Sequence, residues 1–160
     1  MTKDYETLLK ESTGNASMEK SYELPDGTNV CVGKEMFKST ELLFDPSLAD
    51  IQLDGIHLHS YFSIMKCDKN IHEDLFLNVV LAGGSTMFKD METRIQNDLK
   101  KLLADNNQSD YKVNMIHSVE RDVAAWVGGS ILAGQSTFQS WISKDKYEEE
   151  GPGVIHYKGM

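Results

Sequence analysis

Residues 126–141 read WVGGSILAGQSTFQSW, and this stretch decides how the chain is interpreted. Residues 123–133 are mostly apolar and predict a helix. Gly128 and Gly129 lie inside that helix, where two glycines cost roughly 2 kcal/mol relative to alanines. We therefore expect a compensating reason: either another backbone packs closely there, or a ligand approaches the helix. Ser136 and Thr137 predict the cap of a further short helix, and a similar cap precedes a helix at residues 143–149.

A second informative stretch, LAGGSTMF, occupies residues 81–88. A short buried strand is predicted at residues 79–82, and Gly83 and Gly84 end it. Because glycines lack Cβ atoms, the backbone can approach a ligand closely there, and the amides that follow could face a nucleotide phosphate or sugar. A purely steric strand-to-helix turn is the alternative. The stretch is not a P-loop, since no Gly-Lys-Ser/Thr follows.

The remaining pattern mixes strands and helices, which indicates an α/β class. Pro25-Asp26-Gly27 between two β-rich runs predicts a hairpin over residues 21–32. Helices are expected at residues 2–11, 55–66, 71–77 and 89–103, with a small polar loop at 13–17 and a half-buried strand at 112–116. The longest helix has one apolar face, formed by Met91, Ile95, Leu99 and Leu102.

Composition limits the classes of function. The chain has 160 residues, 40% of them hydrophobic, and a formal net charge of −9. This charge argues against a general binder of nucleic acid or of anionic membranes, because both need clustered Lys and Arg. No apolar run approaches the ~18 residues of a membrane span. Cys31 and Cys67 are expected to be reduced thiols of a cytosolic protein.

Few side chains suggest metal binding or catalysis. His57 and His59 diverge by about 200° on a helix, so we do not expect them to share a metal ion. No Ser/His/Asp or Cys/His arrangement follows from spacing. The Glu148-Glu149-Glu150 run is interpreted as a solvated face.

Several motifs in order resemble the actin family. They are SYELPDG (21–27), FDPS (44–47), SIMKCD (63–68) with Asp74-Leu75, LAGGSTM (81–87), WVGGSILA (126–133), STFQ (136–139) with WISK (141–144), and GP (151–152) with His156. The likeness is collinear from about residue 21 to residue 158. It implies the fold shared by actin, sugar kinases and heat-shock chaperone ATPases, here as an incomplete, carboxy-terminal portion.

The resemblance also implies a division of the chain and a set of site residues. Residues 1–51 would be a remnant of actin subdomain 4, residues 52–122 part of subdomain 3, and residues 123–160 the carboxy-terminal helices of subdomain 1. The residues expected to touch the nucleotide are Gly83, Gly84, Ser85, Met87 and Phe88. The residues expected to line the cleft for actin-binding proteins are Val127, Ile131, Leu132, Gln135 and Thr137. The tip of the plug between filament strands would be Leu48, Ala49, Asp50 and Ile51.

By family, the protein would form cytoskeletal filaments in the cytoplasm and bind ATP or ADP with Mg²⁺ or Ca²⁺. Its partners would be other actin subunits and actin-binding proteins. The family's phosphate hairpins, its water-positioning Gln and His, and its metal-site Asp residues have no counterpart here. In-line attack on a γ-phosphate needs positioned water, metal and phosphate donors together, so no ATP hydrolysis is expected from this chain alone.

Four matched positions depart from the family pattern and indicate a divergent member. Asp122 stands where the family has a Lys near adenine, and Phe88 replaces a Tyr. Asp50 brings a charge to the plug tip, and Gln135 makes the partner cleft more polar. Burying an unpaired carboxylate at the plug would cost several kcal/mol.

Two interpretations follow from the resemblance. The chain is a divergent actin or part of one, or it is a truncated relative that binds actin partners without polymerising. A sugar kinase of the same superfold is a third reading, but no residue supports a sugar site. Without the first half of the fold, apolar faces such as Met91, Ile95 and Leu99, or Ile131 and Leu132, are expected to stay partly exposed.

Overall fold

The structure, a computed structural model, describes residue 7 and residues 19–158, with the backbone alone for Lys158. The helix expected at residues 2–11 and the loop at 13–17 lie outside these residues, apart from Thr7. Elements marked η are 3₁₀ helices. In chain order the elements are β1 (Lys20–Glu23), β2 (Asn29–Val32), α2 (Glu35–Glu41), η2 (Pro46–Ala49), α3 (Ile56–Met65), η3 (Lys69–Ile71), α4 (His72–Leu77), β3 (Val79–Val80), η4 (Gly84–Met87), α5 (Met91–Asp105), β4 (Met115–Ile116), α6 (Ala124–Ala133), α7 (Lys144–Glu150), η5 (Gly151–Val154) and α8 (Ile155–Lys158).

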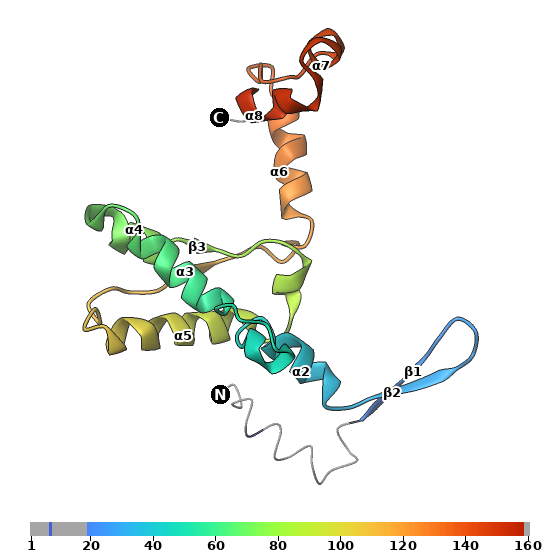
Figure 1. Cartoon of the computed structure of the whole chain (residues 1–160), viewed down its shortest axis with the longest axis vertical. Coiled ribbons are helices and arrows are strands. Elements are labelled where there is room, and N and C mark those ends of the chain that lie inside the picture. The colour runs from blue at the N-terminus through green and yellow to red at the C-terminus, as the bar shows by residue number, and fades with distance from the viewer. Residues whose placement is uncertain (1–6, 8–18, 159–160) are drawn as a thin grey trace.

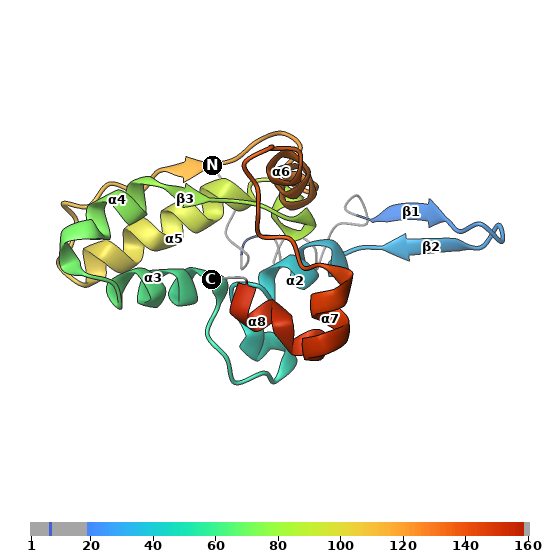
Figure 2. The same ribbon diagram turned by 90° about the horizontal axis from the view of Figure 1, so that it is seen from above.

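A packed body lies between two projecting arms (Figure 1). The body consists of α3, α4 and α5 with the β3–β4 pair. The β1–β2 hairpin forms one arm, and α6 rises away from the body as the other, with α7 and α8 at its far end (Figures 1 and 2). Within the described residues, no helix is long and apolar enough to cross a membrane.

The hairpin is confirmed as predicted. β1 and β2 pair antiparallel, with Lys20 opposite Val32 and Glu23 opposite Asn29. Gly27 adopts φ +83°, a left-handed conformation that favours glycine at this turn. The Thr28 amide donates to the Asp26 carboxylate at 2.9 Å, and this bond lowers the pKa of Asp26.

The core forms where α5 packs against α3 and the β3–β4 pair. Its apolar face buries Met91, Ile95 and Leu99, which carry the predicted spacing. Leu103 is buried instead of Leu102, which packs at the edge of the core. Phe76 of α4 is completely buried and stacks on Tyr111 with ring centroids 5.7 Å apart. The expectation that the α5 face stays exposed is therefore wrong, because α3, α4 and the strands cover it.

β3 and β4 form a short parallel pair, in which Val79 faces Met115 and Val80 faces Ile116. The predicted strand at residues 79–82 is two residues long. Of the strand expected at residues 112–116, only Met115–Ile116 is a strand, but the side chains alternate as predicted: Val113 and Met115 are buried, whereas Lys112, Asn114 and Ile116 are exposed. The pair places the loop after β3 beside the loop after β4, at one end of the body.

One helix expected from the sequence is absent, and one helix in the structure was not expected. No helix follows Ser136 and Thr137; residues 135–143 are a turn and an irregular segment that leads to α7. α2 was not predicted, and none of its residues is buried, so it lacks the apolar stripe that marks a helix in sequence. The α7 cap is confirmed, since the Ser143 hydroxyl accepts from the Lys146 amide at 3.3 Å.

Candidate functional site

The five residues expected at a nucleotide lie together on one turn, residues 83–88, which we call the glycine turn. It follows β3 and contains η4. Gly83 adopts φ +91°, which L side chains rarely tolerate, so glycine is required there for its backbone conformation. The Thr86 amide and hydroxyl both donate to the Gly83 carbonyl, at 3.0 and 2.7 Å. These bonds close the turn.

Gly84 differs from Gly83, because its backbone does not require glycine. A Cβ atom built there would meet no described atom within 4 Å. The backbone at Gly84 is therefore open on the side where a side chain would project, and a ligand could approach it there. Met87 and Phe88 are both nearly half exposed beside it, so two apolar side chains border the same surface.

The long helix does not start at the glycines. α5 begins only at Met91, after Asp90 in a left-handed conformation at φ +63°. The amides next to the glycines therefore belong to a single 3₁₀ turn. The predicted approach of a ligand to this backbone is geometrically available at Gly84, whereas the predicted contribution of a long helix start is not.

Arg121 contacts the glycine turn, and the sequence reasoning missed it. Its Nη2 donates to the Thr86 carbonyl at 2.9 Å, and its Nε donates to the Thr86 hydroxyl oxygen at 3.1 Å. Its own carbonyl accepts from the Gly83 amide at 2.7 Å. The two residues it joins are 35 and 38 positions away in sequence, so no spacing rule could have found the contact. Asp122, the neighbouring residue, is exposed.

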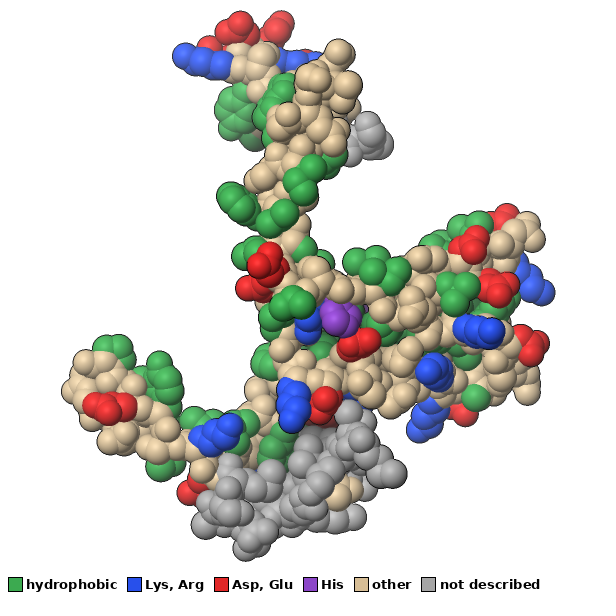
Figure 3. Space-filling view, turned by 180° about the vertical axis from the view of Figure 1, so that it is seen from behind, with side chains coloured by type: hydrophobic (Ala, Val, Ile, Leu, Met, Phe, Trp, Pro, Cys, Tyr) green, Lys and Arg blue, Asp and Glu red, His purple; other side chains and the backbone are tan. Residues whose placement is uncertain are grey.

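The residues expected at a partner cleft lie on and just after α6, and all are exposed. They are Val127, Ile131, Leu132, Gln135 and Thr137. Ile131 and Leu132 each expose more than half of their surface, which confirms the expectation of exposed apolar residues here. Hydrophobic side chains run along the arm that carries α6 (Figure 3). No described atom comes within 4 Å of a Cβ built at Gly128 or Gly129, so among the described residues no backbone packs against the pair.

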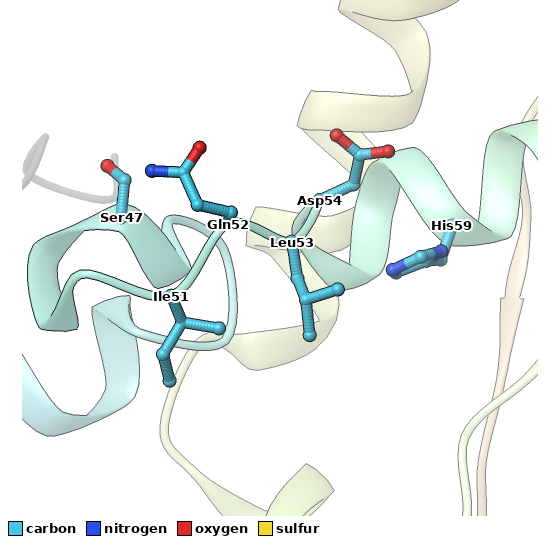
Figure 4. Close-up of a pocket in the computed structure, with 6 residues that line it drawn as sticks. All are labelled: Ser47, Ile51, Gln52, Leu53, Asp54 and His59. Atoms are coloured by element: carbon cyan, nitrogen blue, oxygen red, sulfur yellow. The ribbon is translucent and has the colours of Figure 1, made fainter.

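The expected plug residues, Leu48, Ala49, Asp50 and Ile51, are exposed at the end of η2. Asp50 has φ +57° and its carboxylate faces solvent, so no burial penalty arises in this structure. A hollow of about 360 Å³ lies beside this segment. It is lined by Ser47, Ile51, Gln52, Leu53, Asp54 and His59. Figure 4 shows Gln52 and Asp54 on one side of this extended segment and Ile51 and Leu53 on the other.

The two histidines of α3 lie in different surroundings. His57 packs on Phe44 with ring centroids 5.9 Å apart, and its Nδ1 is buried without a hydrogen-bond partner. Burial lowers the pKa of His57; nearby Arg94 also lowers it, whereas the carboxylates of Asp98, Glu41 and Asp54 oppose the shift. His59 is exposed at the hollow. Among the described residues, no three His, Cys, Asp or Glu side chains form a group that could hold a metal ion.

These features define a mixed α/β protein with a glycine turn at the end of a parallel strand pair and an exposed apolar helix. A comparison with protein families finds that the Actin family model matches residues 2–160. The chain belongs to the actin family.

Proposed function

We propose that this protein is a divergent actin-family member that binds the adenosine side of ATP or ADP at the glycine turn. The observation that carries the proposal is Gly84, which has open space above it and no conformational need for glycine. Family membership supports the choice of ligand, because actins bind ATP or ADP together with a divalent cation. Met87 and Phe88 supply apolar contact area beside the turn.

The proposed role is binding without hydrolysis by this chain. Residues 1–51, 52–122 and 123–160 would be parts of actin subdomains 4, 3 and 1, and under this assignment the chain would supply the adenosine side of the site without the family's phosphate hairpins. In the described residues, no ligand set for Mg²⁺ or Ca²⁺ accompanies the turn. The chain would therefore hold the nucleoside, while the phosphates and the cation depend on other groups.

A second role is favoured by the α6 arm. Its exposed apolar residues are Val127, Ile131 and Leu132, which we call the α6 row, and the polar Gln135 and Thr137 follow the end of the helix. Such a surface suits an actin-binding partner or another actin subunit in the cytoskeleton of the cytoplasm. Asp50, a charge at the proposed plug, opposes burial between filament strands. Partner binding without polymerisation is thus the alternative function.

Nucleotide titration of the full chain tests the main proposal. ATP and ADP should bind saturably, and Gly84→Val should weaken binding by about tenfold or more, because its side chain would keep a ligand away from the backbone that is open at Gly84. Gly153→Val is the matched control, since Gly153 also has open space and no positive φ but belongs to η5, which joins α7 to α8 at the far end of the α6 arm (Figure 1). Absence of saturable binding, or equal affinities for wild type and Gly84→Val, would refute the proposal.

Co-sedimentation with actin filaments tests the alternative. If the α6 row binds a partner, Ile131→Lys should abolish co-sedimentation while leaving the melting temperature unchanged, because that side chain is already mostly exposed. Wild-type chain that stays wholly in the supernatant would exclude filament binding. Loss of binding together with unfolding of Ile131→Lys would count against a surface role for this residue.

A further inference from the structure

The glycine turn is not held in place by packing. η4 contains no buried residue, and Met87 and Phe88 beside it are nearly half exposed. Two adjacent glycines also give the turn more conformational freedom than any other residue pair would. Its single closed shape must therefore come from hydrogen bonds rather than from apolar contacts.

Arg121 makes the bonds that join the turn to the rest of the body. The guanidinium donates from two nitrogens to Thr86, in the middle of the turn, and the Arg121 carbonyl accepts from the Gly83 amide at its start. A third nitrogen, Nη1, donates to the Ser118 carbonyl at 3.3 Å, which fixes the orientation of the planar group. One residue thus bonds to the start and to the middle of the turn, and its bonds to Thr86 use the rigid fork geometry that distinguishes Arg from Lys.

We propose that Arg121 is a positioning residue that locks the glycine turn in the conformation that accepts a nucleotide. The inference rests on the proposed nucleotide role of this turn. The Arg121 carbonyl bonds the Gly83 amide directly, and the guanidinium holds Thr86, whose amide and hydroxyl donate to the Gly83 carbonyl. These bonds keep Gly83 in its left-handed conformation, and with it the exposed backbone at Gly84. A turn that is closed only part of the time would bind with the affinity of the closed turn multiplied by the fraction of time for which it is closed.

The test uses three variants of the full chain and two measurements. Arg121→Met removes the fork, and Arg121→Lys keeps the charge but cannot donate from a planar pair of nitrogens. Lys89→Met is the matched control, because it removes an exposed positive charge next to the turn without touching these bonds. Hydrogen exchange of the Thr86 amide reports closure of the turn, and titration with ATP reports the site. The amide of Leu99, a fully buried core residue, shows whether the fold is intact.

Arg121→Met should speed exchange at Thr86 by about 10- to 100-fold, as expected for loss of bonds from a charged donor. The ATP dissociation constant should rise by about tenfold, because loss of the fork should leave the turn closed only about a tenth of the time. Arg121→Lys should give intermediate values, whereas Lys89→Met should match wild type in Thr86 exchange and in ATP affinity. Exchange at Leu99 should stay unchanged in all three variants.

Three results would overturn the inference. The first is unchanged Thr86 exchange in Arg121→Met. The second is faster exchange with unchanged ATP affinity, which would show that closure of the turn does not matter for binding. The third is an equal loss of affinity in Lys89→Met, which would leave only a charge effect. If wild type binds neither ATP nor ADP while Arg121→Met still loosens the turn, the proposed nucleotide function is wrong and the lock serves the fold alone.

Discussion

Arg94 connects the segment after the hairpin to the body, and its removal gives the most quantitative prediction. The guanidinium donates two hydrogen bonds to Glu41 of α2, at 2.8 and 3.0 Å, and one to Asp98 of its own helix at 2.7 Å. It also lies over the ring of Phe44, 4.4 Å from the centroid. Burial alone would lower the pKa of Arg94, but the bonds to both carboxylates raise it above its ordinary value.

The degree to which Arg94 and Glu41 are exposed determines how much stability is lost when Arg94 is replaced. Exposed ion pairs contribute about 0–1 kcal/mol, whereas removing one partner of a buried pair costs about 3–5 kcal/mol. The Arg94 side chain is 30% exposed and that of Glu41 is 13% exposed, which places this pair between the two limits. We expect Arg94→Met to lower the free energy of unfolding by about 2–3 kcal/mol, because Glu41 loses its cation in a mostly buried position.

Urea unfolding at neutral pH of Arg94→Met, Glu41→Gln and the double variant measures this coupling. The double variant should cost less than the sum of the single variants by about 1–2 kcal/mol. Lys144→Met is the matched control, since its partner Glu148 lies 3.6 Å away on the surface of α7 and both side chains are mostly exposed. If Arg94→Met costs no more than this control, or the two single effects add, then Arg94 does not hold α2 to the body.

Three further predictions concern substitutions at glycines and at one histidine. Gly55→Ala should destabilise the fold by about 3 kcal/mol or more in the same assay, because its Cβ would lie 2.0 Å from the Phe44 carbonyl oxygen; a neutral effect would contradict the packing of α3. His57, with its lowered folded-state pKa, contributes stability above its ordinary value of 6.5 that is lost as pH falls below it, so His57→Gln should flatten this part of the stability–pH curve; a curve parallel to wild type would refute this. Replacing Gly128 and Gly129 with Ala should raise helix stability by up to about 2 kcal/mol while weakening co-sedimentation with actin filaments; a stability gain without that loss would assign the glycines no role in partner contact.

Local features of the fold were predictable because their signals lie within short segments. The hairpin follows from Pro25-Asp26-Gly27, and the helices α3, α4, α5 and α6 start and end within about two residues of the predicted bounds, as expected for periodic segments. α2 carries no buried residue, so it gives no such signal. The helix expected after Ser136 fails because a capping residue alone does not supply an apolar face for a helix to bury.

The contacts that hold the body together could not be predicted in the same way. Arg94 and Glu41 are 53 residues apart, and Arg121 and Thr86 are 35 apart. Only the folded chain shows that each Arg meets its partner. The glycine turn itself was predictable from two adjacent glycines after an apolar run, whereas the residue that constrains it was not. Sequence reasoning therefore located the candidate site but missed the part that determines its shape.

The chain has two glycine pairs, Gly83-Gly84 and Gly128-Gly129, and a Cβ built at any of the four would meet no described atom within 4 Å. The reasons for glycine nevertheless differ between the two pairs. At the turn, Gly83 has a conformational requirement, and only Gly84 needs an explanation from outside the described residues. In α6, neither Gly128 nor Gly129 has a positive φ or a close neighbour, so the helix bears the full propensity cost with no described contact to offset it. Exposed apolar residues flank the Gly128-Gly129 pair on α6. The long helix α5, by contrast, buries its apolar face in the body. The sequence of α6 is thus better suited to contact with another polypeptide surface than to solvent, which is the condition that the partner-binding proposal requires.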